Sequence, residues 1–201
     1  MSVVVAVALT LMRPPSGAPH AGLAADAGAL PTAAAPPPAP PAHSPPVTLV
    51  VPGHIAPMPV DPVAVGREGA LALPASPFRL GWWALGARPG DARGTVLLAA
   101  HLDSAEQGAG PFQALHTVPL GADVRLTTAD GVRHTYTLVA RRTHPKAALP
   151  RDLFAADGVP RLALVTCTGA YDPGSRAYAD NLVLYGVPAR GGQPVEPGAG
   201  S

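Results

Sequence analysis

The chain is 201 residues long, enough for one domain of ordinary size with extensions but too short for two full domains joined by a linker. Its 27 prolines and 22 glycines make 49 of 201 residues, about twice the average share, so a large part of the chain is not packed core. Only 13% of the residues are charged and the formal net charge is +1, which excludes the basic surface that nucleic-acid binding requires.

The first 46 residues combine two kinds of sequence. An uninterrupted apolar or hydroxylic run of 11 residues, SVVVAVALTLM, ends at Met12. This length is about half the roughly 20 residues of a membrane-spanning helix, but it fits the hydrophobic region of a signal peptide. We therefore expect residues 1–12 to be a signal or anchor segment, with an apolar tail as the alternative. Residues 13–46 are rich in proline and alanine and are expected to form a disordered, extended spacer.

Between residues 47 and 187, short apolar runs are separated by Gly, Pro and Asp at intervals of about 8 to 12 residues. The predicted strands are VTLVV (47–51), TVLLAA (95–100), DVRLTT (123–128), VRHTYTLVARR (132–142), RLALVTC (161–167) and NLVLYGV (181–187). Asp130-Gly131 is a strong hairpin signal between two of them. Segments 111–118 and 148–158 are each expected to form a turn or two of helix, and residues 188–201 a flexible tail. The spacing predicts an all-β domain, either a barrel or a sandwich.

The only cysteine, Cys167, ends the apolar run RLALVTC and is followed by Thr168 and Gly169. A single cysteine excludes an intrachain disulfide, so its sulfur is a free thiol. A thiol at the point where a strand leaves the core is well placed to act as a nucleophile. The alternative is a small buried hydrophobic residue, because free cysteine is among the residues most often buried.

His101 occupies a similar place, at the end of TVLLAA and before a glycine-rich loop. An imidazole at the rim of a strand suits a general acid or base, and the alternative is a histidine that is solvated or caps the strand. Asp103 is expected either to orient His101 or to close a turn. The pair His101 and Asp103 lacks further ligands at a matching spacing, so we predict no metal and no cofactor. Among the other histidines, His116 ends a short predicted helix and is a weaker candidate.

Arg176 lies nine residues after Cys167, beyond the turn sequence Tyr171-Asp172-Pro173-Gly174-Ser175. Asp-Pro-Gly favours chain reversal, so residues 176–185 are expected to run back beside the cysteine strand. A guanidinium there can hold a substrate carbonyl or the oxyanion of a tetrahedral intermediate. The alternative is a surface arginine paired with a nearby aspartate.

Two segments, GTVLLAAHLDS (94–104) and RLALVTCTGAYDPGSRAYADNLVLYG (161–186), resemble the catalytic segments of sortases. The resemblance is strongest to the actinobacterial class F group, with class E as its nearest sister, and it extends over most of residues 47–187. It implies an all-β catalytic domain, the eight-stranded sortase β-barrel with one or two short helices. The catalytic residues that it implies are His101, Cys167 and Arg176. The supporting residues are Asp103, Thr166 and Asn181.

The sequence departs from the class F pattern at three places. Ala100 stands before the histidine where glycine is usual, and Thr168 follows the cysteine where glycine is common. Both changes are small and lie beside the site, so they bear on rate or substrate preference more than on identity. The third departure is the weak apolar segment at the amino terminus, because family members are generally tethered there by a transmembrane helix.

The resemblance implies a cysteine transpeptidase. Such an enzyme cuts a Leu-Pro-x-Thr-Gly-like sorting signal of exported proteins after threonine and passes the acyl group to a cell-wall or other amine, with hydrolysis as a side reaction. We expect a monomer at the outer face of the membrane or in the cell wall, with membrane contact only through residues 1–12 and no nucleic-acid partner. The alternatives are a non-catalytic exported barrel that binds peptides and a cysteine hydrolase on the same scaffold.

Overall fold

The computed structural model describes residues 43–66, 70–175 and 177–189. The expected signal segment, nearly all of the expected spacer, residue 176 and most of the expected tail lie outside these residues. Within them the elements are β1 (Pro46–Val51), β2 (Ile55–Val63), β3 (Leu80–Trp83), β4 (Thr95–Ala99), β5 (Asp103–Ser104), β6 (Gly108–Ala109), η1 (Pro111–His116), β7 (Asp123–Thr128), β8 (Arg133–Pro145), η2 (Lys146–Ala148), η3 (Arg151–Phe154), β9 (Arg161–Asp172) and β10 (Ala177–Pro188).

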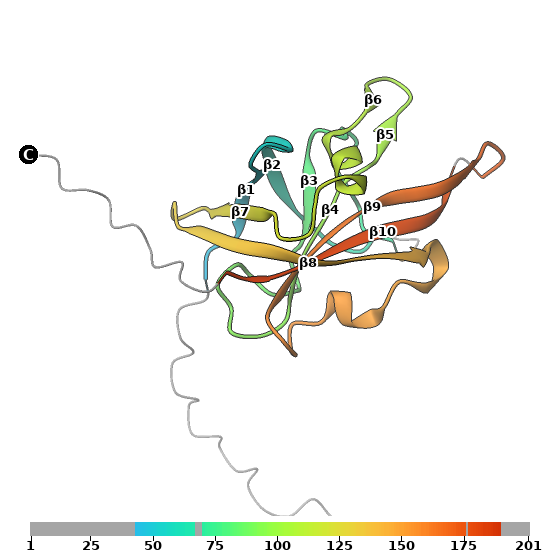
Figure 1. Cartoon of the computed structure of the whole chain (residues 1–201). Helices are drawn as coiled ribbons and strands as arrows, with labels where there is room; N and C mark the ends of the chain where they lie inside the picture. The colour runs from blue at the N-terminus through green and yellow to red at the C-terminus, as the bar shows by residue number, and fades with distance from the viewer. Residues whose placement is uncertain (1–42, 67–69, 176, 190–201) are drawn as a thin grey trace, which may run out of the picture. The chain divides into compact units, whose positions relative to one another are not determined.

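Eight of these strands close into a barrel in the order β1-β2-β3-β4-β9-β10-β8-β7 (Figure 1). The sheet is mixed, because β2 with β3 and β4 with β9 pair in parallel while the other neighbours pair antiparallel. The short pair β5 and β6 forms a separate hairpin. The eight-stranded all-β barrel expected from the sequence is thereby confirmed.

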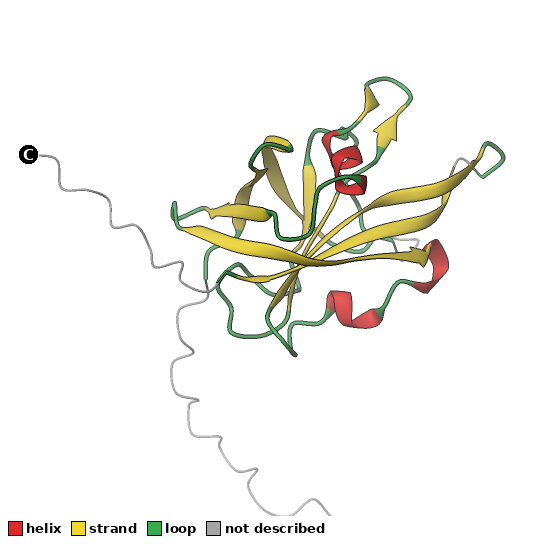
Figure 2. Cartoon of the chain, viewed as in Figure 1, coloured by secondary structure: helices red, strands yellow, loops and turns green. Residues whose placement is uncertain are grey.

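Two local predictions are also confirmed. The hairpin signal joins β7 to β8, where Gly131 has a φ of +82° and its N–H donates to the Thr128 carbonyl at 2.8 Å. Positive φ is the conformation that glycine adopts without steric cost. The expected helical turns are the 3-10 helix η1 in segment 111–118 and the 3-10 helix η3 in segment 148–158, whereas η2 begins at Lys146, before the second segment (Figure 2).

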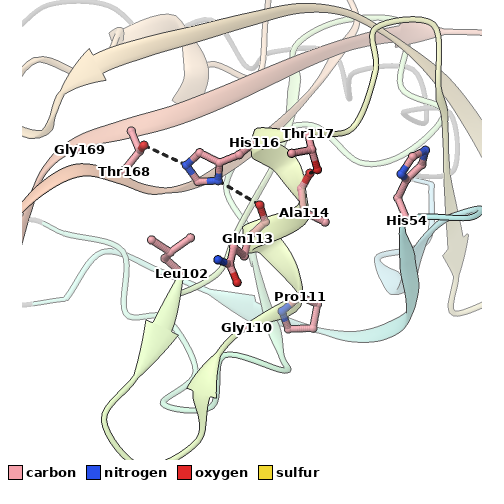
Figure 3. A pocket seen from close by; sticks show the side chains of 10 residues that line it. All are labelled: His54, Leu102, Gly110, Pro111, Gln113, Ala114, His116, Thr117, Thr168 and Gly169. Carbon is pink, nitrogen blue, oxygen red and sulfur yellow. Dashed lines mark hydrogen bonds between the residues drawn. The ribbon is translucent and has the colours of Figure 1, made fainter.

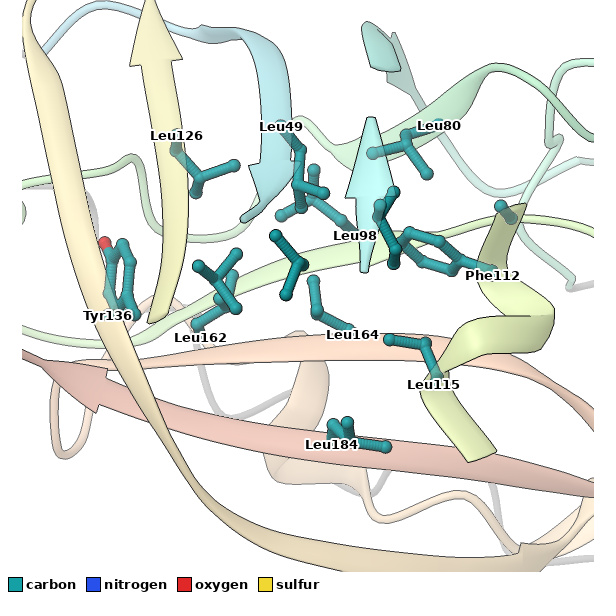
Figure 4. Close-up of a cluster of buried hydrophobic side chains, with 14 of the residues drawn as sticks. Leu49, Leu80, Leu98, Phe112, Leu115, Leu126, Tyr136, Leu162, Leu164 and Leu184 are labelled. Carbon is teal, nitrogen blue, oxygen red and sulfur yellow. The ribbon is translucent and has the colours of Figure 1, made fainter. Parts of the chain in front are cut away.

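The barrel interior holds the main hydrophobic core. Its buried side chains come from all eight barrel strands and from η1, which closes one end with Phe112 and Leu115 (Figure 4). Because successive residues of a strand face opposite sides, Val96 and Leu98 of β4 point into this core. Full burial of a valine or leucine side chain contributes roughly 1.5–3 kcal/mol to folding.

A second, smaller core covers the outer face of β3, β4, β9 and β10. Leu97, Ala99 and Val165 from the barrel pack there against Leu153 of η3, which is fully buried. The ring of Trp83 meets Phe154 edge to face, with centroids 6.0 Å apart. The segment from η2 to η3 is therefore held against the outer face on which the odd-numbered residues of β4 and β9 lie.

Candidate active site

Cys167 lies within β9 between β4 and β10, and it is half-buried. The sequence suggested that the strand ends at this residue, but β9 continues to Asp172 as one arm of a hairpin with β10. What ends at Cys167 is burial, because residues 162–166 are buried and residues 169–172 are exposed. The alternative of a fully buried thiol is therefore wrong for this chain.

His101 follows the end of β4, the strand that pairs in parallel with the cysteine strand β9. The parallel register pairs Ala99 with Val165, the Ala100 N–H donates to the Val165 carbonyl at 3.1 Å, and His101 follows directly. His101 and Cys167 therefore each follow one member of this aligned pair by two residues, His101 just beyond the end of β4 and Cys167 within β9. The chain before the imidazole and the chain before the thiol are thus joined by backbone hydrogen bonds.

Two of the expected supporting residues lie beside this pair of strands. Thr166 is buried, and its hydroxyl donates to the Ala100 carbonyl at 3.1 Å, which adds a side-chain link between the strands. Asn181 of β10 stands directly opposite Cys167 in the antiparallel register and is 7% exposed. Thr166 thus links the cysteine strand to the chain before His101, and Asn181 lies beside Cys167 on the other neighbouring strand.

Asp103 is hydrogen-bonded to a residue of β10. Its carboxylate accepts a hydrogen bond from the Tyr178 hydroxyl, so the loop after His101 is tied to β10. This bond to the carboxylate raises the pKa of Tyr178 to about 12, and the hydroxyl therefore stays protonated at neutral pH. The Tyr178 ring also lies 5.1 Å from that of Tyr171, centroid to centroid. The bond described for Asp103 acts on the loop rather than on the His101 ring.

Burial raises the pKa of the Cys167 thiol above its ordinary value. The positive charge of Lys146, at the start of η2, lowers this pKa, and the negative charge of Asp103 raises it. At neutral pH the resting sulfur is accordingly a thiol, and a base must take its proton when it attacks a carbonyl.

Arg176 lies outside the described residues. The reversal that leads to it is described: the Asp172 carboxylate accepts from the Gly174 and Ser175 N–H groups at 2.9 and 3.3 Å. After residue 176 the chain returns as β10, paired antiparallel with β9 from Ala177 onward. The predicted return strand is confirmed.

An open cavity of about 660 Å³ adjoins the thiol strand (Figure 3). Its lining residues are His54, Leu102, Gly110, Pro111, Gln113, Ala114, His116, Thr117, Thr168 and Gly169. Neither His101 nor Cys167 lines it. Thr168 does line it. This is expected, because successive side chains of a strand point to opposite sides and Thr168 directly follows Cys167.

His116 of η1 bonds to Thr168 across this cavity, with 2.9 Å between imidazole Nε2 and the hydroxyl (Figure 3). The sequence placed His116 among the weaker candidates. Its partner is 52 residues away, and no local pattern connects the two.

Within residues 43–66, 70–175 and 177–189, no group of three or more His, Cys, Asp or Glu side chains is arranged to hold a metal ion. In the same part of the chain, no helix has the length and apolar character needed to cross a membrane.

A protein-family model described as the sortase domain matches residues 55–189. The fold resembles sortase C1 of Streptococcus agalactiae, with a TM-score of 0.54 and 17% identity over 71% of this chain and 66% of that one. It also resembles Group B Streptococcus pilus island 1 sortase C2, with a TM-score of 0.54 and 16% identity over 71% of this chain and 72% of that one. No curated protein matches the sequence significantly.

Proposed function

The chain belongs to the sortase family, and on this premise we propose that it is a cysteine transpeptidase that uses Cys167, His101 and Arg176. The observation that supports the proposal is the parallel pairing of β4 with β9, in which Ala99 and Val165, the residues two positions before His101 and Cys167, are aligned. Acyl transfer to an amine needs a nucleophile that forms a covalent intermediate and a group that moves protons, and these two side chains supply both.

In the first half-reaction, Cys167 Sγ attacks the threonine carbonyl of a Leu-Pro-x-Thr-Gly-like signal while its proton passes to the His101 ring. The C–N bond to glycine then breaks, His101 gives the proton to the leaving amine, and a thioester remains on Cys167. The guanidinium of Arg176 is proposed to stabilise the negative oxygen of the tetrahedral intermediate.

In the second half-reaction, an acceptor amine attacks the thioester carbonyl. The amine loses a proton to His101, the C–S bond breaks, and the thiol of Cys167 takes a proton back, so the enzyme returns to its starting state. Water in place of the amine gives a free carboxylate by the same steps. Hydrolysis is therefore a built-in side reaction of this mechanism.

The burial of Cys167 raises its pKa, which supports a mechanism in which His101 removes the thiol proton only during attack on the substrate. A raised pKa keeps Cys167 protonated at rest, which protects a half-exposed sulfur from oxidation but costs reactivity. Lys146 offsets part of this effect through its positive charge.

We assign the chain to the class F group within the family. The support is the sequence of the two catalytic segments, residues 94–104 and 161–186. The solved structures compared above are sortases C, and their identity of 16–17% to this chain bears on the fold alone.

The proposed location is the outer face of the cell membrane or the cell wall. Residues 1–12 are the proposed signal or anchor, and the proline-rich residues 13–46 are the proposed spacer. A catalytic domain over residues 47–187 acting as a monomer on exported proteins completes the proposal.

The test is a fluorogenic Leu-Pro-x-Thr-Gly peptide incubated with the protein, with and without an amine acceptor, and with products identified by mass spectrometry. The wild type is expected to cleave the peptide and to attach the amine to threonine, while the Cys167→Ala variant does neither. Cleavage without any amine-bearing product would favour the cysteine hydrolase. Equal traces for wild type and Cys167→Ala would leave only the non-catalytic binding module.

A further inference from the structure

The residue after the nucleophile is held by a side chain from a distant element. Thr168 follows Cys167 in β9, and its hydroxyl lies 2.9 Å from Nε2 of His116. The other ring nitrogen, Nδ1, lies 3.0 Å from the Gln113 carbonyl oxygen. The imidazole thus connects the backbone of η1 to the first side chain beyond the thiol (Figure 3).

The hydrogen-bond chemistry fixes which way this connection runs. A carbonyl oxygen only accepts, so Nδ1 of His116 must carry a proton and donate to Gln113. In the neutral ring Nε2 is then bare, and it accepts the hydroxyl proton of Thr168. Only this tautomer satisfies both bonds of the neutral ring.

The η1 end of the connection is rigidly placed. Phe112 and Leu115, both fully buried, fix this short helix to the barrel core. His116 is the next residue after Leu115, and the backbone bond from the Thr117 N–H to the Ala114 carbonyl at 2.9 Å closes the same turn. The imidazole therefore extends from a fixed base even though the ring itself is exposed.

The β9 end, in contrast, is where regular pairing is interrupted. The register between β9 and β10 shifts between Tyr178 and Asp180, immediately after the pair of Asp180 with Thr168. Gly169 has a φ of +84° at this irregularity. Such shifts re-aim neighbouring side chains and loosen the ladder locally. The hydrogen bond to His116 thus restrains Thr168 at the point where the regular pairing of β9 with β10 is interrupted.

We propose that His116 is a positioning residue for Cys167. By holding the Thr168 side chain, it restrains the peptide group between Cys167 and Thr168, and thereby the backbone from which the thiol projects. A productive attack needs Sγ close to the carbonyl carbon and correctly aligned, so freedom at this peptide lowers the rate rather than the affinity. The inference rests on the proposed function, because its effect is on acylation of the thiol.

The chain offers matched variants for the test. His116→Ala and Thr168→Val each remove one end of the hydrogen bond, and Thr168→Ser keeps the hydroxyl. His54→Ala removes an imidazole that lines the same cavity but belongs to the β1–β2 turn. Single-turnover cleavage of the fluorogenic peptide, with enzyme in excess, gives the acylation rate and its half-saturation concentration.

We expect His116→Ala and Thr168→Val each to lower the maximal acylation rate about three- to tenfold, the range of one ordinary hydrogen bond, with half-saturation within about twofold of wild type. The double variant should be no slower than either single variant, because both remove the same bond. Thr168→Ser should acylate like wild type, and so should His54→Ala. Nitrogen-15 spectra of the His116 ring should show a protonated Nδ1, and Thr168→Val should change the Nε2 shift.

Several results would overturn the inference. They are an unchanged rate in His116→Ala, losses that multiply in the double variant, an equal loss in His54→Ala, or a fall in Tm that alone explains the lower rate. A wild type no more active than Cys167→Ala would overturn the proposed function instead, and the positioning role would fall with it. If the wild type is active and His116→Ala acylates at the same rate, the positioning role alone would be overturned.

Discussion

Asp103 and Lys146 carry opposite charges toward the thiol of Cys167, one from the loop after His101 and the other from the first residue of η2. The carboxylate disfavours the thiolate and raises its pKa, while the ammonium group favours the thiolate and lowers it. The pKa of the thiol is thus set by burial together with two side chains from different elements, β5 and η2.

This arrangement predicts shifts of opposite sign in two variants. Asp103→Asn should lower the pKa of Cys167, and Lys146→Gln should raise it further above the ordinary thiol range. The measurement is the rate of iodoacetamide labelling of the folded protein as a function of pH, because only the thiolate reacts. Both variants moving in the same direction would mean that a change of structure, rather than of charge, controls the thiol.

Removing the Tyr178 hydroxyl should free the loop after His101 without altering its charge. Tyr178→Phe leaves the Asp103 carboxylate in place but removes its hydrogen-bond donor. We expect kcat to fall about threefold to tenfold, while the free energy of unfolding changes by about 1 kcal/mol or less, because the bond is exposed. The check is steady-state cleavage alongside urea unfolding. The matched control is Tyr171→Phe, and an equal loss of kcat in that variant would show that ring packing, not the bond to Asp103, is responsible.

The smaller core on the outer face of the barrel is expected to contribute to the stability of the strands that carry Cys167 and precede His101. Leu153 is fully buried against the face that carries Ala99 and Val165, the aligned pair two residues before His101 and Cys167. Leu153→Ala should lower the free energy of unfolding by about 3 kcal/mol, within the usual range for a buried leucine.

Urea unfolding measures this effect, and Leu85→Ala serves as the control because Leu85 is 70% exposed. The control should change stability by less than about 0.5 kcal/mol. A loss below about 1 kcal/mol in Leu153→Ala would show that the segment from η2 to η3 contributes little to holding this face.

The sequence predicted six of the eight barrel strands but missed β3, which is only four residues long, and β2, whose sequence IAPMPVDPV contains three prolines. Proline donates no hydrogen bond and usually indicates a strand edge. The register explains why it is tolerated here: β2 pairs with β1 through residues 55–59 and with β3 only from Val60 onward. Pro57 and Pro59 therefore lie where the strand has a neighbour on one side only.

The site was predictable only in part for a related reason. Local sequence indicated that Cys167 and His101 end apolar runs, and the resemblance to sortases associated them, but the parallel pairing of β4 with β9 is a tertiary property. The bond between His116 and Thr168 is equally non-local. Histidine at the end of a short helix gives no sign of its partner, so propensity and periodicity leave such pairs undetected.

Gly169 and Gly131 have similar backbone conformations but different surroundings. Alanine variants at the two positions therefore distinguish backbone strain from a steric clash of the added side chain. Gly169 and Gly131 have φ values of +84° and +82°, so alanine at either position is strained by about the same amount. A Cβ at Gly169 would lie 2.6 Å from Asp180 Oδ2, whereas nothing lies within 4 Å of one at Gly131.

Gly131→Ala should therefore cost about 1 kcal/mol of unfolding free energy, and Gly169→Ala should cost more. At Gly169, which directly follows Thr168, the added methyl group must displace the Asp180 side chain. Gly169→Ala should therefore also slow acylation of Cys167, whereas Gly131→Ala should not. Asp180→Ala in the Gly169→Ala background removes the obstructing carboxylate and should restore part of both losses. If the double variant is no better than Gly169→Ala, backbone strain rather than the clash with Asp180 limits this position.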